Sequence, residues 1–192
     1  MKFYIDITLL PDVEVGLHFL WQRLYQQIHL ALVDVQGATG TAPLAVSFPE
    51  YDVEMHQLGK KLRLLADDEK YLDKLDIQKW LARLTDYLHV TKVREVPGNI
   101  TTFARFKRLQ AKSNVERLAR RKARREGISE TEALNKLAGF KEEKLRAPFI
   151  NLQSLSSGRN FRLFVAKEEV GQAVAGDFGL YGLSSIATVP MF

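Results

Sequence analysis

The sequence contains no cysteine, and this absence removes several classes of protein at once. Without Cys there are no disulfides, thiol nucleophiles, iron–sulfur clusters or thiolate zinc sites. No stretch approaches the ~18 apolar residues of a membrane-spanning helix. The N-terminus places Asp6 inside its first apolar stretch, so it offers no signal-peptide core. These absences favour a cytoplasmic location and no membrane partner.

Motifs for metals, nucleotides and common nucleophiles are missing as well. The sequence has four histidines, His18, His29, His56 and His89, and no two of them have the helical spacing of metal ligands. The sequence contains neither GxxxxGK[ST] nor GxSxG. We therefore expect no metal and no cofactor. A reaction carried by this chain should use chemistry that the substrate mostly supplies itself.

The N-terminal half has the hydrophobic patterns of an α+β domain. The chain has 192 residues, of which 46% are hydrophobic, enough for a globular core in one domain or two small ones. Alternating and helical periods predict the order β-α-β-β-α-β, over residues 2–10, 13–35, 45–48, 61–65, 67–87 and 90–96. This order is that of a ferredoxin-like fold. We predict a ferredoxin-like domain over residues 1–97, ending at Pro97-Gly98.

Residues 98–192 form the second predicted region, a C-terminal α/β region with an arginine-rich helix. A basic strand or loop is expected over 101–110, two capped helices follow, and strands are expected over 149–155 and 161–167. Glycines punctuate residues 176–182, where we interpret them as strand bulges and not as a phosphate loop.

Positive charge is concentrated in one segment of this region. The chain carries 28 Lys and Arg against 23 Asp and Glu, a formal charge of +5. Between Arg105 and Arg125 there are ten Lys or Arg and one acid, Glu116, whereas the rest of the chain is net acidic. Such an imbalance indicates a polyanion-binding element, most commonly for nucleic acid. A solvated basic helix or a membrane-surface helix is the alternative.

The spacing of these charges predicts an arginine face on a helix. Ser113 and Glu116 form a capping box at its start, and Gly127 ends it. Five arginines lie on one side of this helix: Arg117, Arg120, Arg121, Arg124 and Arg125. Arginine favours bidentate contacts with phosphates and base edges. A second helix, from Ser129 to Gly139, is expected to pack on the apolar back of the first through Leu134, Leu137 and Ala138.

RNA is a substrate that supplies its own nucleophile. The 2′-hydroxyl can attack the neighbouring phosphate when a base, an acid and positive charge are present, so a His, a hydroxyl and arginines would suffice. Taken alone, His29 is more often a surface or core residue. The serines near 154 are by default turn residues, Tyr181 is strand packing, and Phe161 is either core or a stacking platform.

Several linked motifs together resemble one known family across essentially the whole chain. They are residues 108–114 (RLQAKSN), 154–158 (SLSSG), 160–164 (NFRLF), 181–184 (YGLS), 27–32 (QIHLAL) and 46–49 (VSFP). In these motifs the sequence resembles the CRISPR-RNA-processing endoribonucleases of type I-F systems. The resemblance implies a ferredoxin-like N-terminal domain and an arginine helix that enters the major groove of an RNA hairpin. It further implies metal-independent cleavage of the CRISPR repeat at the 3′ base of the stem, leaving a 2′,3′-cyclic phosphate. The product would stay bound in a surveillance complex with other Cas subunits.

The resemblance also implies roles for individual residues. His29 matches the catalytic histidine, acting as base or acid, Ser154 matches the serine that orients the attacking nucleotide, and Tyr181 matches a tyrosine that holds the histidine region. Arg108 and Gln110 match a pair that reads base edges. Contacts to phosphates or to nucleotides at the cut are implied for Arg117, Arg120, Arg121, Arg124, Arg125, Ser156, Ser157 and Phe161. At Glu126 this chain has an acid where family members can continue the basic face.

Two other functions are consistent with the same residues. A non-catalytic RNA-hairpin-binding subunit would use the arginine helix without His29. A DNA-binding regulator would use the two capped helices as a helix-turn-helix variant, although the arginine helix carries no Asn or Gln on its face for base reading. Whether binding requires RNA, and whether bound RNA is cut in EDTA, separates the three.

Overall fold

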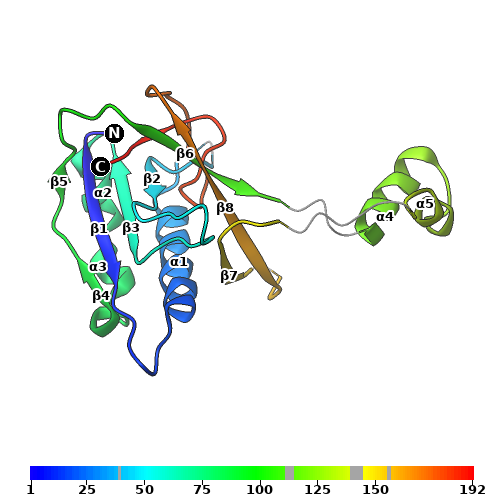
Figure 1. Cartoon of the computed structure of the whole chain (residues 1–192), viewed down its shortest axis with the longest axis horizontal. Helices are drawn as coiled ribbons and strands as arrows, with labels where there is room; N and C mark the ends of the chain where they lie inside the picture. The colour runs from blue at the N-terminus through cyan, green and yellow to red at the C-terminus, as the bar shows by residue number, and fades with distance from the viewer. Residues whose placement is uncertain (39, 111–114, 139–144, 155–156) are drawn as a thin grey trace. The chain divides into compact units, whose positions relative to one another are not determined.

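The structure is a computed structural model that describes residues 1–38, 40–110, 115–138, 145–154 and 157–192. Its contacts divide the chain into two compact units, one of Met1–Arg108 with Ala147–Phe192 and one of Leu109–Arg146 (Figure 1). The first unit is mixed α/β with two antiparallel sheets. The expected functional boundary at residue 98 is a different division from this one, and it stays a prediction.

The first sheet is built around β1 at its centre. Its strands are β1 (Phe3–Leu9), β2 (Leu44–Ser47), β3 (Lys61–Ala66), β4 (Leu88–Val90) and β5 (Arg94–Glu95). They run in the order β2-β3-β1-β4, and β5 also pairs with β1. Every pairing in this sheet is antiparallel. β-branched and leucine side chains supply most of the buried positions, as expected for strands that pack on a core.

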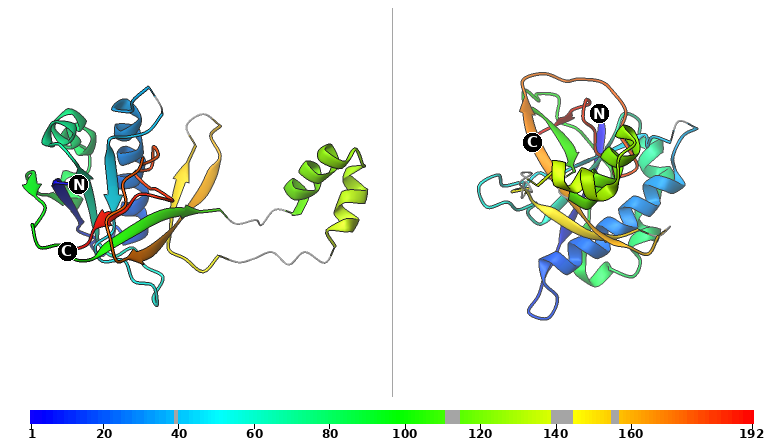
Figure 2. Two further views of the ribbon diagram at one scale, coloured as in Figure 1. Left: turned by 90° about the horizontal axis from the view of Figure 1, so that it is seen from above. Right: turned by 90° about the vertical axis from the view of Figure 1, so that its right-hand side faces the viewer.

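Helices cover this sheet, and α1 (Leu17–Asp34) is the longest of those described. Its buried stripe repeats with the helical period at Leu20, Leu24, Ile28 and Leu32. α1 contacts β1, α2 (Glu69–Leu75) and α3 (Ile77–Leu81), and it also contacts β7 (Phe149–Gln153) of the second sheet (Figure 2). The helix therefore lies between the two sheets and can present side chains to both.

Three predicted elements differ from the observed ones. The helix expected from residue 13 begins at Leu17, because the Asp12 carboxylate accepts hydrogen bonds from the amides of Glu14 and Val15 and forms a turn there. The single helix over 67–87 is wrong: it breaks at Asp76, whose φ of 43° is left-handed, and it ends in a 3₁₀ turn, Thr85–Tyr87. The strand over 90–96 is two short strands, β4 and β5.

The second sheet contains the C-terminal strands. They are β6 (Phe103–Leu109), β7 (Phe149–Gln153), β8 (Asn160–Val170) and β9 (Val189–Pro190), in the order β7-β8-β6-β9. β7 and β8 are antiparallel, with Phe149 opposite Phe164 at one end of their ladder and Gln153 opposite Asn160 at the other. In Figure 2 this pair stands as a hairpin beside α1.

A segment near the C-terminus joins the two sheets. The Gly182 carbonyl accepts from the Val46 amide on β2 at 2.8 Å, and the Ser184 amide donates to the Phe106 carbonyl on β6 at 3.0 Å. Gly182 has a φ of +67°, and a Cβ there would lie 2.3 Å from the Val46 side chain. The interpretation of Gly179 and Gly182 as strand bulges is wrong, because residues 179–182 form a turn in which the Gly182 amide donates to the Gly179 carbonyl at 2.7 Å.

A buried ion pair crosses the first sheet. Arg63 on β3 lies opposite Asp6 on β1 and donates two hydrogen bonds to its carboxylate, at 2.6 and 2.9 Å. A third donor of Arg63 reaches the Phe192 carbonyl at 2.8 Å, and the Phe192 ring lies 3.7 Å from the guanidinium carbon. Arg63 thus neutralises a buried carboxylate and also holds the last residue against the sheet.

The second unit is a pair of helices, α4 (Val115–Glu126) and α5 (Glu130–Lys136). Its small core contains Ala119, Ala123 and Ala133, with Ile128 and Leu137 packed against it. Leu137 therefore packs as predicted. The prediction is wrong for Leu134 and Ala138, which are exposed, because the close contact is made by Ala133 instead. Ser129 caps α5, and its Oγ accepts from the Glu132 amide at 3.1 Å.

In the described ranges, no helix combines the length and the apolar character needed to cross a bilayer.

Candidate functional site

His29 lies on α1 with one ring nitrogen fixed by the backbone. Its Nδ1 is 2.9 Å from the Leu180 carbonyl oxygen. Because a carbonyl oxygen only accepts hydrogen bonds, Nδ1 must carry the proton and donate it. In the neutral ring Nε2 then has the free lone pair, and in the cation Nε2 carries a second proton. The same atom, Nε2, can therefore accept or deliver a proton.

The His29 ring is also held by an aromatic neighbour. The Tyr181 ring stacks on it, with ring centroids 4.3 Å apart and planes inclined by 11°. Phe161, on β8, meets the Tyr181 ring edge-on, with ring centroids 6.4 Å apart. His29, Tyr181 and Phe161 are all half-buried, so each ring has a face or edge open to solvent. The structure brings these three predicted site residues together.

Arg108 completes this cluster from β6. Its guanidinium carbon lies 5.5 Å from the centroids of both the Phe161 and Tyr181 rings. Stacking of this kind holds the planar guanidinium while its donors remain available. The Arg108 residue is exposed, and Gln110, just beyond the end of β6, is exposed too. Both are therefore accessible to a ligand.

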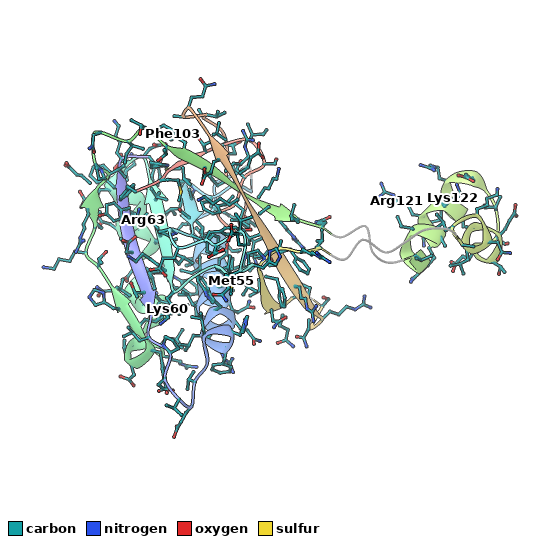
Figure 3. All side chains as sticks on the ribbon, viewed as in Figure 1. Met55, Lys60, Arg63, Phe103, Arg121 and Lys122 are labelled. Atoms are coloured by element: carbon teal, nitrogen blue, oxygen red, sulfur yellow. The ribbon has the colours of Figure 1, made fainter. Side chains whose placement is uncertain are left out.

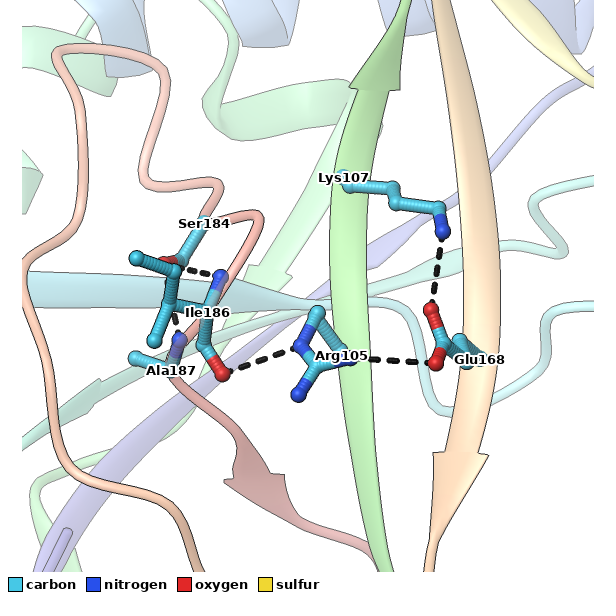
Figure 4. Close-up of polar contacts among 6 residues, drawn as sticks. All are labelled: Arg105, Lys107, Glu168, Ser184, Ile186 and Ala187. Atoms are coloured by element: carbon cyan, nitrogen blue, oxygen red, sulfur yellow. Dashed lines mark hydrogen bonds and ion pairs between the residues drawn. The ribbon is translucent and has the colours of Figure 1, made fainter.

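The strand alternation separates Arg108 from the other cations of β6. Arg105 and Lys107 lie on the opposite face, where both pair with Glu168 of β8 at 3.0 and 2.8 Å (Figure 4). Arg105 also donates to the Ile186 carbonyl at 2.9 Å. The hydrogen bond from Lys107 is the main reason why the pKa of Glu168 is lowered. These two cations are engaged within the fold, so the basic segment is not uniformly available to a polyanion.

Tyr25 is a residue of this site that the sequence analysis did not identify. It is buried on α1, one turn before His29, and its hydroxyl donates to the Tyr181 carbonyl at 2.8 Å. α1 therefore holds two successive carbonyls, those of Leu180 and Tyr181, through side chains at positions i and i+4. The i, i+4 spacing was a visible signal, but the partner segment is more than 150 residues away.

Burial further favours the protonated form of both tyrosines of the site, which ordinary tyrosines also adopt near pH 7. It raises the pKa of Tyr25 above the ordinary value, with a further contribution from Tyr181. It also raises the pKa of Tyr181, although the charge of Arg108 opposes this shift. Both phenols are thus neutral near pH 7, and Tyr25 acts only as a hydrogen-bond donor to the backbone.

Ser154 and Ser157 lie between β7 and β8. The Ser154 Oγ is 2.9 Å from the Ser157 Oγ, and the Ser154 carbonyl accepts from the Gly158 amide at 2.7 Å. Ser154 is half-buried and Ser157 is exposed, whereas Ser156 lies outside the described residues. β7, which leads into this turn, packs against α1. The roles of Ser154, Ser156 and Ser157 stay predictions.

The arginines of the second unit lie on α4. Arg120, Arg121, Arg124 and Arg125 are exposed, and the side chain of Arg117 lies outside the described part. Figure 3 shows Arg121 and Lys122 on this helix. Within the described residues, no acid pairs with Arg120, Arg121 or Arg124. These side chains can therefore meet an external anion without first breaking an ion pair that the structure describes.

Glu126 changes the charge at the end of this face. Its carboxylate lies 2.8 Å from the Lys122 ammonium, 3.4 Å from Arg125 and 3.8 Å from Lys136. The Lys122 hydrogen bond is the main cause that lowers its pKa. Glu126 therefore competes with any phosphate for Arg125, whereas among the described residues it forms no ion pair with Arg120, Arg121 or Arg124.

Comparison with known proteins identifies the family. The sequence matches the family described as "CRISPR-associated protein (Cas_Csy4)" over residues 4–192. It is 36% identical over 193 residues to a protein of Escherichia coli (strain UTI89 / UPEC) and 38% identical over 193 residues to one of Pseudomonas aeruginosa (strain UCBPP-PA14). Both relatives are named "CRISPR-associated endonuclease Cas6/Csy4", and both alignments cover 100% of each chain.

A solved structure described as "Characterization of a Cas6-related gene from Pyrococcus furiosus" aligns with a TM-score of 0.34 and 9% identity, covering 98% of this chain and 99% of that one. A likeness of that size supports no inference, and the assignment rests on sequence. The chain belongs to the Csy4 family of CRISPR-associated proteins.

Proposed function

We propose that this chain is an RNA-specific endoribonuclease that binds the CRISPR repeat hairpin and cuts it at the 3′ base of the stem without a metal ion. The names of its relatives, which are CRISPR-associated endonucleases, support an endonuclease activity. The RNA specificity, the position of the cut and the 2′,3′-cyclic phosphate product come from the resemblance described above.

The hydrogen bond from His29 Nδ1 to the Leu180 carbonyl is the observation that carries this proposal. A histidine that only packed in the core would also pair its ring N–H, but it would not keep its ring half-buried and open to solvent as His29 does. Here the backbone fixes the tautomer and Tyr181 fixes the ring plane, so that Nε2 is directed by two independent contacts. Proton transfer to or from one particular oxygen of the RNA requires an imidazole that is oriented in this way.

The proposed reaction balances with the groups of the RNA, one histidine and solvent water. The 2′-oxygen forms a bond to the adjacent phosphorus while the bond from phosphorus to the 5′-oxygen breaks. One proton leaves the 2′-hydroxyl and one joins the 5′-oxygen. Nε2 of His29 can accept the first or deliver the second, with solvent water making the other transfer, and Ser154 would orient the attacking nucleotide. Arginines stabilise the charge that develops on the phosphate oxygens.

The cluster around Arg108 would hold the base of the stem. Arg108 and Gln110 would read base edges, since Arg pairs with guanine and Gln with adenine in bidentate fashion. Phe161 would stack beneath the last base pair, and Ser156 and Ser157 would contact the nucleotides at the cut. The contact of Arg108 with the Phe161 and Tyr181 rings supports a common site for base reading and cleavage.

The arginine helix would bind the phosphates of the hairpin. An A-form major groove is too narrow for an ordinary helix, but a short stem with a nearby loop and end gives access. We assign phosphate contacts to Arg117, Arg120, Arg121, Arg124 and Arg125. The contact at Arg125 is the weakest of these, because Glu126 already lies against it.

The arrangement of the N-terminal residues supports a ferredoxin-like domain over 1–97. Its elements run β1-α1-β2-β3, then the helical stretch that is divided into α2, α3 and a 3₁₀ turn, then β4 and β5, and its sheet order of β2-β3-β1-β4 is antiparallel throughout. Residues 98–192 would then form the hairpin-binding region. Because product release requires breaking many phosphate contacts, the enzyme would retain the mature crRNA and join other Cas subunits of a type I-F surveillance complex with it.

The test of this function uses purified protein and labelled RNA hairpins in EDTA. The substrates are the repeat encoded beside the gene, an unrelated hairpin and the repeat hairpin as DNA, and the product ends are mapped. The proposal predicts one cut at the 3′ base of the cognate stem, a cyclic phosphate end, and no cut when that nucleotide is 2′-deoxy.

Other outcomes point to the alternative functions. Tight binding of the cognate RNA without cleavage would contradict the enzyme and favour a hairpin-binding subunit. Binding that prefers duplex DNA would contradict an RNA-specific protein altogether.

A further inference from the structure

The β7–β8 hairpin has a second face that the proposed reaction does not use. Side chains alternate along both strands, and those on one face, Ile150, Leu152, Leu163 and Val165, are buried in the core. The opposite face carries Phe149, Asn151 and Gln153 on β7 and Asn160, Arg162 and Phe164 on β8. We call these six residues the outer face. None of them is fully buried.

Two aromatic rings, tilted by 53° to one another, and a guanidinium form a cluster on the outer face. Phe149 and Phe164 are direct cross-strand neighbours, with ring centroids 5.3 Å apart. The Arg162 guanidinium carbon lies 4.7 Å from the Phe149 ring centroid. Arg162 is exposed and both rings are half-buried. Nucleobases stack on such surfaces, since proteins that bind single-stranded RNA present aromatic rings and arginine planes on sheet faces.

The charge of this face suits a polyanion. In the described part of the chain, Arg162 has no acidic partner. Glu168, further along the same side of β8, already pairs with two cations, Arg105 and Lys107 (Figure 4). The amides of Asn151, Gln153 and Asn160 add neutral donors and acceptors that are exposed. A single strand of RNA would therefore meet stacking groups, one free cation and hydrogen-bonding groups.

The position of the outer face links it to the proposed cut site. Its Gln153–Asn160 end adjoins the turn with Ser154 and Ser157, and the Phe149–Phe164 pair lies four residues away. That separation is ~13 Å of strand, or about four nucleotides at the spacing of a stacked strand. A chain of RNA that continues past the turn can therefore reach the aromatic pair.

We propose that the outer face binds the single-stranded RNA that continues on the 3′ side of the cut. The proposal rests on the proposed function, because that function places the cut at the turn. The nucleotide before the cut belongs to the stem, so the unpaired strand attached directly at the cut is the downstream one. A base about four nucleotides downstream would stack on Arg162 and Phe149.

The test measures how a single-stranded extension changes hairpin affinity. Cognate hairpins with a 2′-deoxy nucleotide at the cut carry 3′ extensions of zero, two, four or eight nucleotides, and a parallel set carries 5′ extensions. Stacking of one base predicts a step in affinity: hairpin affinity rises about fivefold or more when the 3′ extension grows from two to four nucleotides. We expect no comparable step on the 5′ side.

The variants test whether the outer face causes this step. Arg162→Gln should abolish most of it, and Arg162→Lys should also reduce it, because Lys keeps the charge but not the plane. Arg83→Gln removes an exposed arginine elsewhere and should leave the step unchanged. All variants should bind the hairpin without an extension as the wild type does.

The results separate this inference from the function on which it rests. An equal step in wild type and Arg162→Gln, a step on the 5′ side only, or no step at all would each overturn the inference. If the hairpin without an extension fails to bind, or the all-RNA hairpin is not cut, the proposed function itself fails.

Discussion

The Tyr25→Phe substitution tests how α1 positions His29, which we propose as the catalytic histidine. It removes one hydroxyl and leaves the ring in place, so the Tyr181 carbonyl loses its 2.8 Å hydrogen bond while the core stays filled. The next carbonyl in the chain, that of Leu180, is the one that holds His29 Nδ1. We therefore expect the substitution to loosen the contact that fixes the tautomer without removing any group that touches RNA.

The structure sets the size of the expected effect. Removing one partner from a buried hydrogen bond costs about 1–2 kcal/mol, which for a chain of this length lowers Tm by about 2–8 °C. If a comparable part of that energy orients His29 in the transition state, single-turnover cleavage slows about five- to tenfold. Affinity for a hairpin with a 2′-deoxy nucleotide at the cut should change less than twofold.

Tyr51→Phe is a matched control for this experiment. The Tyr51 hydroxyl donates to the Val165 carbonyl at 2.9 Å, a similar bond that does not involve the histidine segment. Both variants should lose thermal stability, but only Tyr25→Phe should lose rate. Nitrogen NMR of His29 should show a smaller Nδ1–H fraction in Tyr25→Phe alone. Equal cleavage rates for Tyr25→Phe and wild type, despite a lower Tm, would refute the positioning role.

The contribution of Tyr25 to the free energy of unfolding also depends on pH. Burial raises the pKa of Tyr25 above that of an unfolded tyrosine, which is near ~10. The folded state therefore holds the phenolic proton more tightly, so its contribution to stability is complete below pH ~10 and is lost as the pH rises further. Above that pH, denaturant titrations should show a steeper loss of unfolding free energy in the wild type than in Tyr25→Phe.

Three further predictions concern the turn, the stack and the helix. Gly182→Ala should lower Tm by several degrees, because its φ is +67° and the new Cβ would lie 2.3 Å from Val46, and an unchanged Tm would contradict this tight packing. Tyr181→Phe should cleave RNA at nearly the wild-type rate and Tyr181→Ala more slowly, because the Tyr181 ring, and not its hydroxyl, contacts His29. Equal losses of cleavage rate in the two variants would argue against this role of the ring. In salt titrations of hairpin affinity, Arg124→Gln should reduce the slope by about one, and Lys122→Gln should reduce it less, because its ammonium is already in an ion pair.

Local patterns predicted most elements of the first unit. Alternating apolar residues identified β1, and a helical stripe identified α1, because each element buries one side against a single core. The break at Asp76 was missed, since a left-handed aspartate inside a helical pattern gives no local signal. The exposure of Leu134 was missed for a related reason: an alanine one position earlier allows the closer helix contact.

The candidate site was only partly visible in the sequence. The resemblance indicated His29, Tyr181 and Phe161, but nothing local shows that their rings meet, because they come from three distant segments. Tyr25 was overlooked because its partner is a backbone carbonyl, and backbone atoms have no signature in a sequence. Arg105 and Lys107 counted toward the basic segment, although Glu168 engages both of them.

We propose that His29 transfers a proton through Nε2 while the Leu180 carbonyl holds its Nδ1. The most direct measurement compares wild type and His29→Ala in single-turnover cleavage of the cognate hairpin in EDTA, with affinity measured in parallel on the 2′-deoxy hairpin. This role of His29 predicts that the cleavage rate falls by a factor of at least about 10², while affinity stays within a few-fold of wild type. Cleavage that persists in His29→Ala, or cleavage and binding that are lost together, would contradict it.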